Sequence, residues 1–152
     1  GKEVRLKYAY YVTCKEIIKN QNGEVTEIIC TYDPESRGGD SPDGRRVKGT
    51  IQWVDANTAI PTEVRLYDRL FSVPNPEENN DDGDFIQHLN PDSLTILNSC
   101  LVEQCLEESE IGLTFQLERI GYFCKDNDSA KEDRLILNRT VALRDSWGKT
   151  HK

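Results

Sequence analysis

Short runs of alternating apolar and polar residues recur along most of this chain, and they constrain its fold more than any other feature. Alternation with a period of two is typical of a β-strand with one buried face and one solvated face. Segments rich in Gly, Pro and Asn separate the runs at intervals of roughly ten residues, a spacing typical of β-barrels and β-sandwiches. The pattern predicts an all-β fold, and two small antiparallel β-barrels with short helical connections suit the length better than one large sandwich.

The clearest local signal is a β-hairpin near the start of the chain. Residues 4–18 and 25–32 alternate, and Asn22-Gly23 between them supplies the positive φ values that a tight turn needs. Residues 33–44 contain three glycines and two prolines among small polar residues, so they are predicted to form a loop.

The middle and end of the chain predict further strands. Residues 45–54 alternate, with a basic and amide-bearing outer face, and residues 62–71 are predicted to be a strand leading into a short helical turn. Residues 85–89 are predicted to form a short helical piece ended by a proline. Residues 114–123 and 134–144 are predicted to be two long strands that pair as a closing hairpin.

Length and composition set the broad class. The chain has 152 residues, enough for one ordinary domain or two small ones, with 36% hydrophobic and 30% charged residues. It contains no apolar run of membrane-spanning length and no signal-peptide pattern. We therefore expect a cytoplasmic protein with no membrane partner.

Metal and catalytic chemistry find little support in the sequence. The five cysteines include no CxxC pair, and only two histidines are present. Phosphate-binding glycine loops and nucleophile motifs are absent, and the acidic residues gather in segments predicted to be exposed. The sequence predicts no metal site and no catalytic residue in this chain.

The net charge of −8 argues against a polyanionic partner, but the charge of the chain is segregated. Two acidic stretches, residues 77–84 and 103–110, contain no Lys or Arg, and the rest of the chain is close to neutral. Local potential steers a polyanion more than net charge does. The candidate basic clusters are Arg5 and Lys7; Arg45, Arg46 and Lys48; Arg65 and Arg69; and Arg134, Arg139, Arg144 and Lys149.

The two predicted strands of the closing hairpin differ from an ordinary solvated surface in their polar residues. These residues have planar groups that can make two directed hydrogen bonds at once, which suits the edges of bases or carboxylates. They are Gln116, Arg119, Asn138, Arg139 and Arg144. The pair of strands is therefore the candidate recognition surface.

Five blocks of sequence between residues 48 and 147 resemble a known family in the same order, and with GKEVRL at 1–6 and CTYD at 30–33 the resemblance runs over nearly the whole chain. The family is the C-terminal anticodon-binding region of glutaminyl-tRNA synthetase, of the bacterial type. Related glutamyl-tRNA synthetases share two of the blocks, and they remain an alternative. The blocks are KGTIQWV at 48–54, EVRLYDRLF at 63–71, NPDSL at 90–94, FQLERIGYF at 115–123 and NRTVALRDSW at 138–147.

The resemblance implies a function and partners. In the family this region consists of two β-barrels that grip the anticodon loop of tRNA(Gln), while a separate catalytic domain uses ATP and Mg to attach glutamine. None of the motifs of that domain occurs here, so we expect residues 1–152 to be a fragment of a larger glutamine-tRNA ligase. The fragment itself would carry no cofactor and would not bind DNA.

The resemblance also assigns candidate anticodon-binding residues. Gln116 and Arg119 match family residues that contact the middle and third anticodon bases, and Arg144 and Ser146 match positions lining the same pocket. Arg5 matches a residue near the first base. Lys7 stands where bacterial members have Arg, which removes a planar fork of donors.

Stacking or wall residues of the base pocket form a further set of candidates, and each of them has packing in a core as its alternative role. They are Tyr122, Phe123 and Trp147. A competing function is that of a β-barrel interaction module whose basic clusters meet an acidic protein surface.

Overall fold

The protein is described by a computed structural model that covers residues 1–38, 41–77 and 84–143. The chain divides into two compact units, Gly1–Trp53 (unit 1) and Val54–Lys152 (unit 2). Nine strands and four 3-10 helices make up the regular structure of the described residues, which include no α-helix. The predicted all-β class is therefore confirmed. No helix in the described ranges is long and apolar enough to cross a membrane.

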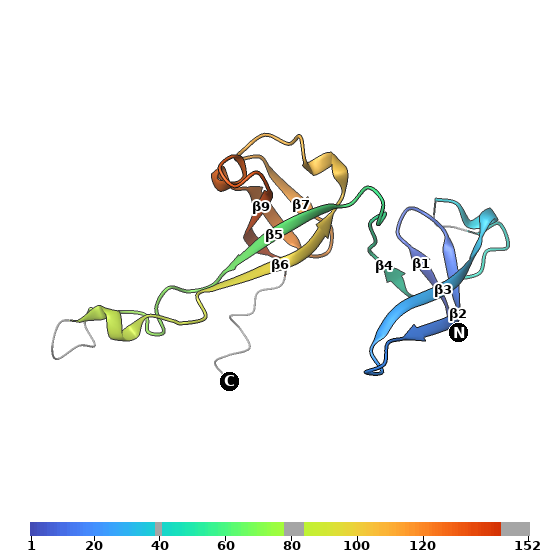
Figure 1. The fold of residues 1–152 in the computed structure, drawn as a ribbon, viewed down its shortest axis with the longest axis horizontal. Helices are drawn as coiled ribbons and strands as arrows, with labels where there is room; N and C mark the ends of the chain where they lie inside the picture. The colour runs from blue at the N-terminus through green and yellow to red at the C-terminus, as the bar shows by residue number, and fades with distance from the viewer. Residues whose placement is uncertain (39–40, 78–83, 144–152) are drawn as a thin grey trace. The chain divides into compact units, whose positions relative to one another are not determined.

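Unit 1 is built on a four-stranded sheet with the order β3-β2-β1-β4. The strands are β1 (Glu3–Leu6), β2 (Tyr11–Lys19), β3 (Val25–Asp33) and β4 (Thr50–Ile51), and the 3-10 helix η1 (Pro34–Ser36) follows β3. β2 and β3 form the long hairpin that is prominent in Figure 1, while β4 pairs with β1 in parallel. Gly23 closes the hairpin with φ of 82°, as predicted, whereas Asn22 does not have the positive φ predicted for it.

Two predicted strands of unit 1 are wrong in extent. The run 4–18 is two strands, because a turn closed by a hydrogen bond from the Ala9 amide to the Leu6 carbonyl (3.0 Å) interrupts it. The run 45–54 contributes only Thr50–Ile51 to the sheet. Arg45 at its start instead joins a turn, because its backbone amide bonds the Asp43 carboxylate at 3.0 Å.

Arg45 links three segments of unit 1. Its guanidinium makes two parallel hydrogen bonds to the Glu3 carboxylate, at 2.9 and 3.0 Å, and it also bonds Asp33 and Asp43. It lies 5.2 Å from the ring centroid of Tyr11, which is 1% exposed. Such bidentate contacts tie the loop before β4 to β1 and to the end of β3.

These contacts give unit 1 a predicted sensitivity to acid. The Arg45 side chain lowers the pKa of Glu3 and of Asp33, and the Arg45 backbone amide is the main cause that lowers the pKa of Asp43 to about 2. Carboxyls with depressed folded pKa values add stability that is present above their unfolded pKa values of about 4 and is lost as the pH falls toward 2. Unfolding followed by circular dichroism at several pH values should show this loss.

The matched variants separate the contribution of Arg45 from that of general acid denaturation. Arg45→Met should be less stable than the wild type at pH 7 and should depend less on pH between about 5 and 2. Arg46→Met, at the adjacent exposed residue, should keep the wild-type dependence. Equal slopes for the wild type and Arg45→Met would contradict the assignment.

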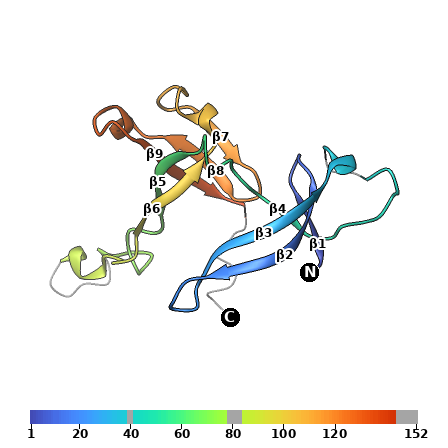
Figure 2. The same ribbon diagram turned by 45° about the vertical axis from the view of Figure 1, so that its right-hand side comes forward.

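Unit 2 is built on a five-stranded sheet with the order β6-β5-β9-β8-β7. The strands are β5 (Ile60–Tyr67), β6 (Leu94–Val102), β7 (Thr114–Leu117), β8 (Gly121–Lys125) and β9 (Leu135–Ala142). Figure 2 shows β5 and β6 running together and β7, β8 and β9 continuing the sheet. β9 lies at the centre, parallel to β5 and antiparallel to β8.

The core of unit 2 is centred on β9. This strand has a neighbouring strand on each side, and other parts of unit 2 pack against both of its faces. Leu137 is fully buried on one face, in a cluster with Val64, Val102, Phe123 and Leu135. On the other face Ile136 is fully buried under the 3-10 helix η4 (Asn127–Ala130), where the Ile136 backbone amide bonds the Ser129 hydroxyl at 3.0 Å.

The remaining 3-10 helices lie in the connections of unit 2. They are η2 (Phe85–His88), as predicted for residues 85–89, and η3 (Gln104–Leu106). The helical turn predicted at the end of the run 62–71 is wrong. Phe71 instead forms an isolated antiparallel bridge with Leu89. The segment that follows β5 and the segment that precedes β6 therefore stay paired beyond the ends of the two strands.

The predicted antiparallel barrels are also wrong in detail. In the described residues each unit has an open sheet with two edge strands, and each sheet includes one parallel pair. The parallel pairs arise because β4 and β9 return beside β1 and β5 after long connections, an arrangement that alternation in the sequence does not encode.

Candidate nucleic-acid interface

The main candidate residues of unit 2 lie on the β7–β8 hairpin. Gln116 is exposed on β7, opposite Tyr122 of β8, which in turn lies opposite Val141 of β9. Cross-strand partners project from the same face of a sheet, so the Gln116 amide lies beside the Tyr122 ring on the solvent side. Tyr122 is 40% exposed and Val141 is 56% exposed, which makes an amide, a phenol and an apolar side chain available in one row.

Arg119 lies at the tip of the same hairpin. The predicted long strand 114–123 is in fact folded back on itself, and the turn is closed by a hydrogen bond from the Ile120 amide to the Leu117 carbonyl (2.9 Å). Arg119 occupies the third position of this four-residue turn with φ of 65°. Glycine is the residue preferred at that position of a type II turn, so an arginine there is held against its backbone preference.

The two aromatic candidates of this hairpin have different roles. Phe123 is 2% exposed and belongs to the core, so the prediction that it lines a base pocket is not supported by its burial. Tyr122 lies on the opposite side of β8 and remains a candidate. Gly121 lets β8 approach β9 closely, since a Cβ there would stand only 2.8 Å from the Val141 carbonyl oxygen.

Two further candidates, Arg144 and Ser146, lie outside the described residues, as does Trp147. β9 ends at Ala142, which pairs with Gly121 at the start of β8. The described residues therefore end at Leu143, one residue after the β9 residue that pairs beside the β7–β8 turn.

In unit 1 the candidates Arg5 and Lys7 belong to β1 and to the turn that follows it. Both are partly buried. The Arg5 Nη2 donates to the Tyr11 hydroxyl at 2.9 Å, while the Lys7 Nζ lies 5.0 Å from the ring centroid of Tyr8. The Lys7 ammonium therefore lies beside the exposed ring of Tyr8, whereas the Arg5 guanidinium is held by the buried Tyr11 side chain.

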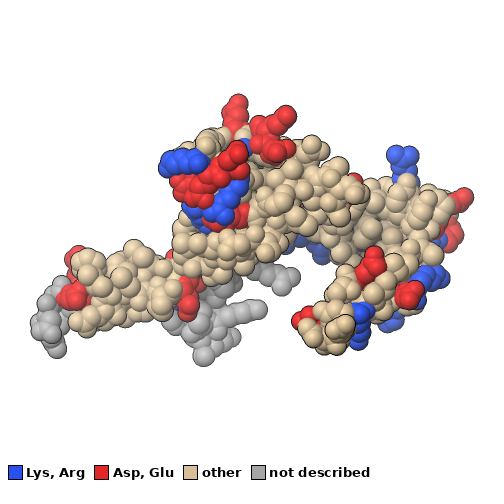
Figure 3. Space-filling view, viewed as in Figure 1, with Lys and Arg blue, Asp and Glu red and all other residues tan. Residues whose placement is uncertain are grey.

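Several of the predicted basic clusters are neutralised by acids within their own unit. Arg65 bonds Glu63 at 2.7 Å and Asp128 at 3.0 Å, and Arg134 bonds Glu63 at 2.8 Å. Arg45 is bound by three carboxylates, as described above. On the face shown in Figure 3, basic and acidic side chains lie beside one another on both units. The described candidates for contact with a polyanion are therefore Gln116, Arg119, Lys7 and Arg5.

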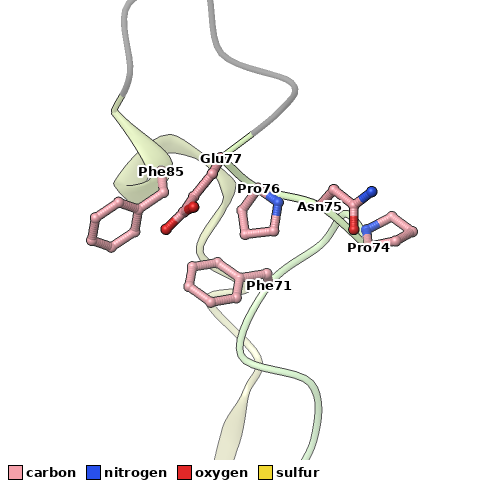
Figure 4. Close-up of a pocket in the computed structure, with 6 residues that line it drawn as sticks. All are labelled: Phe71, Pro74, Asn75, Pro76, Glu77 and Phe85. Atoms are coloured by element: carbon pink, nitrogen blue, oxygen red, sulfur yellow. The ribbon is translucent and has the colours of Figure 1, made fainter.

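A hollow in unit 2 lies in the connection from the end of β5 to the start of β6, and none of the candidate anticodon-binding residues lines it. It has a volume of about 380 Å³, and Phe71 and Phe85 form one of its walls, with ring centroids 6.1 Å apart. Figure 4 shows prolines, an asparagine and one glutamate completing the lining. In the part of the chain that is described, no group of three or more His, Cys, Asp or Glu residues is arranged to hold a metal ion.

Comparison with known families identifies the chain. Residues 50–126, half of the chain, match the family described as "tRNA synthetases class I (E and Q), anti-codon binding domain", and residues 1–33 match a second family model of the same description. The chain belongs to this family of anticodon-binding domains. The resemblance drawn from the sequence blocks is thereby confirmed.

Individual relatives agree with the family assignment. The chain is 52% identical over 149 residues to the glutamine–tRNA ligase of Nitrobacter winogradskyi. The aligned residues make up 98% of the chain and 26% of the relative. It is 51% identical to the enzyme of the same name from Vibrio campbellii and 50% identical to that from Rhodopirellula baltica. The chain thus spans about a quarter of the length of these relatives.

Proposed function

We propose that this chain recognises the anticodon loop of tRNA(Gln), reading the second and third anticodon bases with the β7–β8 hairpin of unit 2. The observation that carries the proposal is the placement of Gln116 and Arg119 on one hairpin, the first on its exposed face and the second at its tip. Membership of the anticodon-binding family and the identity of the relatives support it.

The chemistry of the hairpin suits single-stranded bases. Such bases are unstacked, packed against aromatic rings and bonded along their Watson–Crick edges. The Gln116 amide offers a donor and an acceptor, and the Arg119 guanidinium offers a fork of donors. Tyr122, beside Gln116, offers a ring against which a splayed base packs.

Arg144 and Ser146 complete the proposed pocket on the basis of the family motif. Arg144 follows β9 by two residues in the sequence, and Ala142 at the end of β9 pairs with Gly121 next to the β7–β8 turn. Arg5 and Lys7 of unit 1 are proposed to contact the first base or its phosphate. Lys7 would act as a point charge, because an ammonium lacks the planar fork of the arginine found in bacterial members.

The whole protein is proposed to be a glutamine–tRNA ligase. Its relatives bear that name, and the chain spans only the part that matches their anticodon-binding domain. The ATP and Mg that ligation needs are proposed to bind in a catalytic domain outside these residues, with which the present chain would act on one tRNA.

Gln116→Ala tests the proposed role of the hairpin. Binding of the cognate anticodon stem-loop, measured by fluorescence titration, should weaken by about 1–3 kcal/mol, because one base would lose its paired donor and acceptor. Thr114→Ala is the matched control on the same strand, and it should bind as the wild type does. An unchanged affinity for Gln116→Ala would remove this residue from the interface.

A further inference from the structure

Tyr8 of unit 1 is held in a backbone conformation that its side chain disfavours. It occupies the third position of the turn Leu6–Ala9 with φ of 60°. The turn is fixed on both sides, because the Leu6 amide bonds the Tyr10 carbonyl at 2.9 Å and the Ala9 amide bonds the Leu6 carbonyl. A left-handed conformation costs a residue other than glycine about 1–2 kcal/mol.

Packing within unit 1 does not account for this cost. The Tyr8 side chain is 75% exposed, more than any other large apolar residue in the described chain. An aromatic ring so far in solvent recovers little of its burial energy. A strained residue that does not stabilise the core points to a role in binding.

The turn of Tyr8 has the same form as the turn of Arg119. In each hairpin the third turn residue has a positive φ, of 60° or 65°, at a position that favours glycine. In each, an amide one residue further on closes the turn on the carbonyl at its first position. Both turns thus present one large side chain outward from a hairpin tip.

Neighbouring groups fix the turn and place a cation beside the ring. The Lys7 amide bonds the Ile51 carbonyl at 3.0 Å, and the Trp53 indole donates to the Lys7 carbonyl at 2.9 Å. The Lys7 ammonium lies 5.0 Å from the Tyr8 ring centroid. An exposed ring flanked by a cation provides the two elements with which proteins hold single-stranded nucleic acid, a stacking face and a charge for the phosphate.

We infer that Tyr8 is a stacking platform for the first anticodon base, with Lys7 holding the adjoining phosphate. The inference rests on the proposed function and adds to it an aromatic contact in unit 1. The sequence alone does not suggest this role for Tyr8, because the alternation predicts one uninterrupted strand over residues 4–18.

The test is a cycle that combines a protein variant with a modified RNA. Tyr8→Gly removes the ring and suits the positive φ, so the variant should fold at least as well as the wild type in thermal unfolding. Its affinity for the cognate stem-loop should fall about 10-fold. Tyr8→Phe should bind as the wild type does, and so should Tyr32→Ala, which removes another exposed tyrosine of unit 1.

An RNA that lacks the first anticodon base completes the cycle. If Tyr8 stacks on that base, the abasic stem-loop should bind the wild type and Tyr8→Gly equally weakly, because the removed partners are the two sides of one contact. A penalty for Tyr8→Gly that persists with the abasic RNA, or no penalty with the intact RNA, would overturn the inference while leaving the Gln116 result to decide the proposed function. Failure of the wild type to prefer the cognate loop would overturn both.

Discussion

Replacing Arg65 with alanine is expected to destabilise the protein by about 3 kcal/mol, because it leaves a buried carboxylate without its principal partner. The Glu63 side chain is only 4% exposed and shares hydrogen bonds with Arg65, at 2.7 Å, and with Arg134. Arg65 also joins β5 to η4 through Asp128. Its guanidinium, whose pKa these carboxylates raise above the ordinary value with Glu63 as the largest cause, stays charged throughout the working range.

Urea unfolding compares this variant with two controls. Lys131→Ala removes a 73%-exposed partner of the same Asp128 and should cost less than about 0.5 kcal/mol. Adding Glu63→Gln to Arg65→Ala should recover part of the loss, since the buried charge is then gone. If Arg65→Ala kept full stability but weakened RNA binding and lowered its salt dependence, Arg65 would instead be a phosphate contact.

Replacing Arg119 with glycine should separate binding from stability. Glycine adopts the positive φ of this turn freely, so the free energy of unfolding should stay unchanged or rise by up to about 1 kcal/mol. Binding of the cognate stem-loop should weaken by roughly 10- to 100-fold, because the fork of donors at the hairpin tip is lost. Thermal unfolding and a binding titration on the same preparation give both values.

Asp133→Gly is the matched control for Arg119→Gly. Asp133 also has a positive φ, of 49°, and is exposed, but it lies between η4 and β9 and not on the proposed interface. Its replacement should change stability in the same direction and leave RNA binding unaltered. A loss of binding for Asp133→Gly of the same size would show that added backbone freedom at a positive-φ position, rather than the loss of the arginine group, lowers the affinity.

The sequence predicted strands better than it predicted the turns between them. The β2–β3 hairpin was predicted because Asn22-Gly23 is an explicit turn signal. The turns at Tyr8 and Arg119 carry a tyrosine and an arginine where glycine is expected, so local propensity gave no sign of them. Each was read as the middle of a longer strand, and both prove to be hairpin tips.

The sheet organisation could not be read from alternation alone. Period-two patterning specifies which side chains share a face, but it does not specify which strands become neighbours. The parallel pairs of β1 with β4 and of β5 with β9, and the open edges of both sheets, depend on contacts distant in sequence. The predicted barrels lacked that information.

The positions of the candidate site residues in the fold were predicted in part. Gln116 and Arg119 do share one hairpin. The sequence placed both residues on one long strand, whereas in the structure Gln116 lies on β7 and Arg119 lies in the turn between β7 and β8. Charge counting overestimated the basic surface, because Arg45 and Arg65 are bound by carboxylates two residues away, Asp43 and Glu63, and by others far away in the sequence. The distant partners are not visible without the fold.

The central claim is that this chain distinguishes anticodon bases, and one titration tests it most directly. Stem-loops with the anticodon of tRNA(Gln), and with its second and third bases exchanged, are bound to the wild-type protein at several salt concentrations. We predict that both complexes weaken with salt, because phosphate contacts release counterions, and that each exchanged base costs about 1–3 kcal/mol. Equal affinity for the cognate and exchanged loops at every salt concentration would contradict base recognition by these residues.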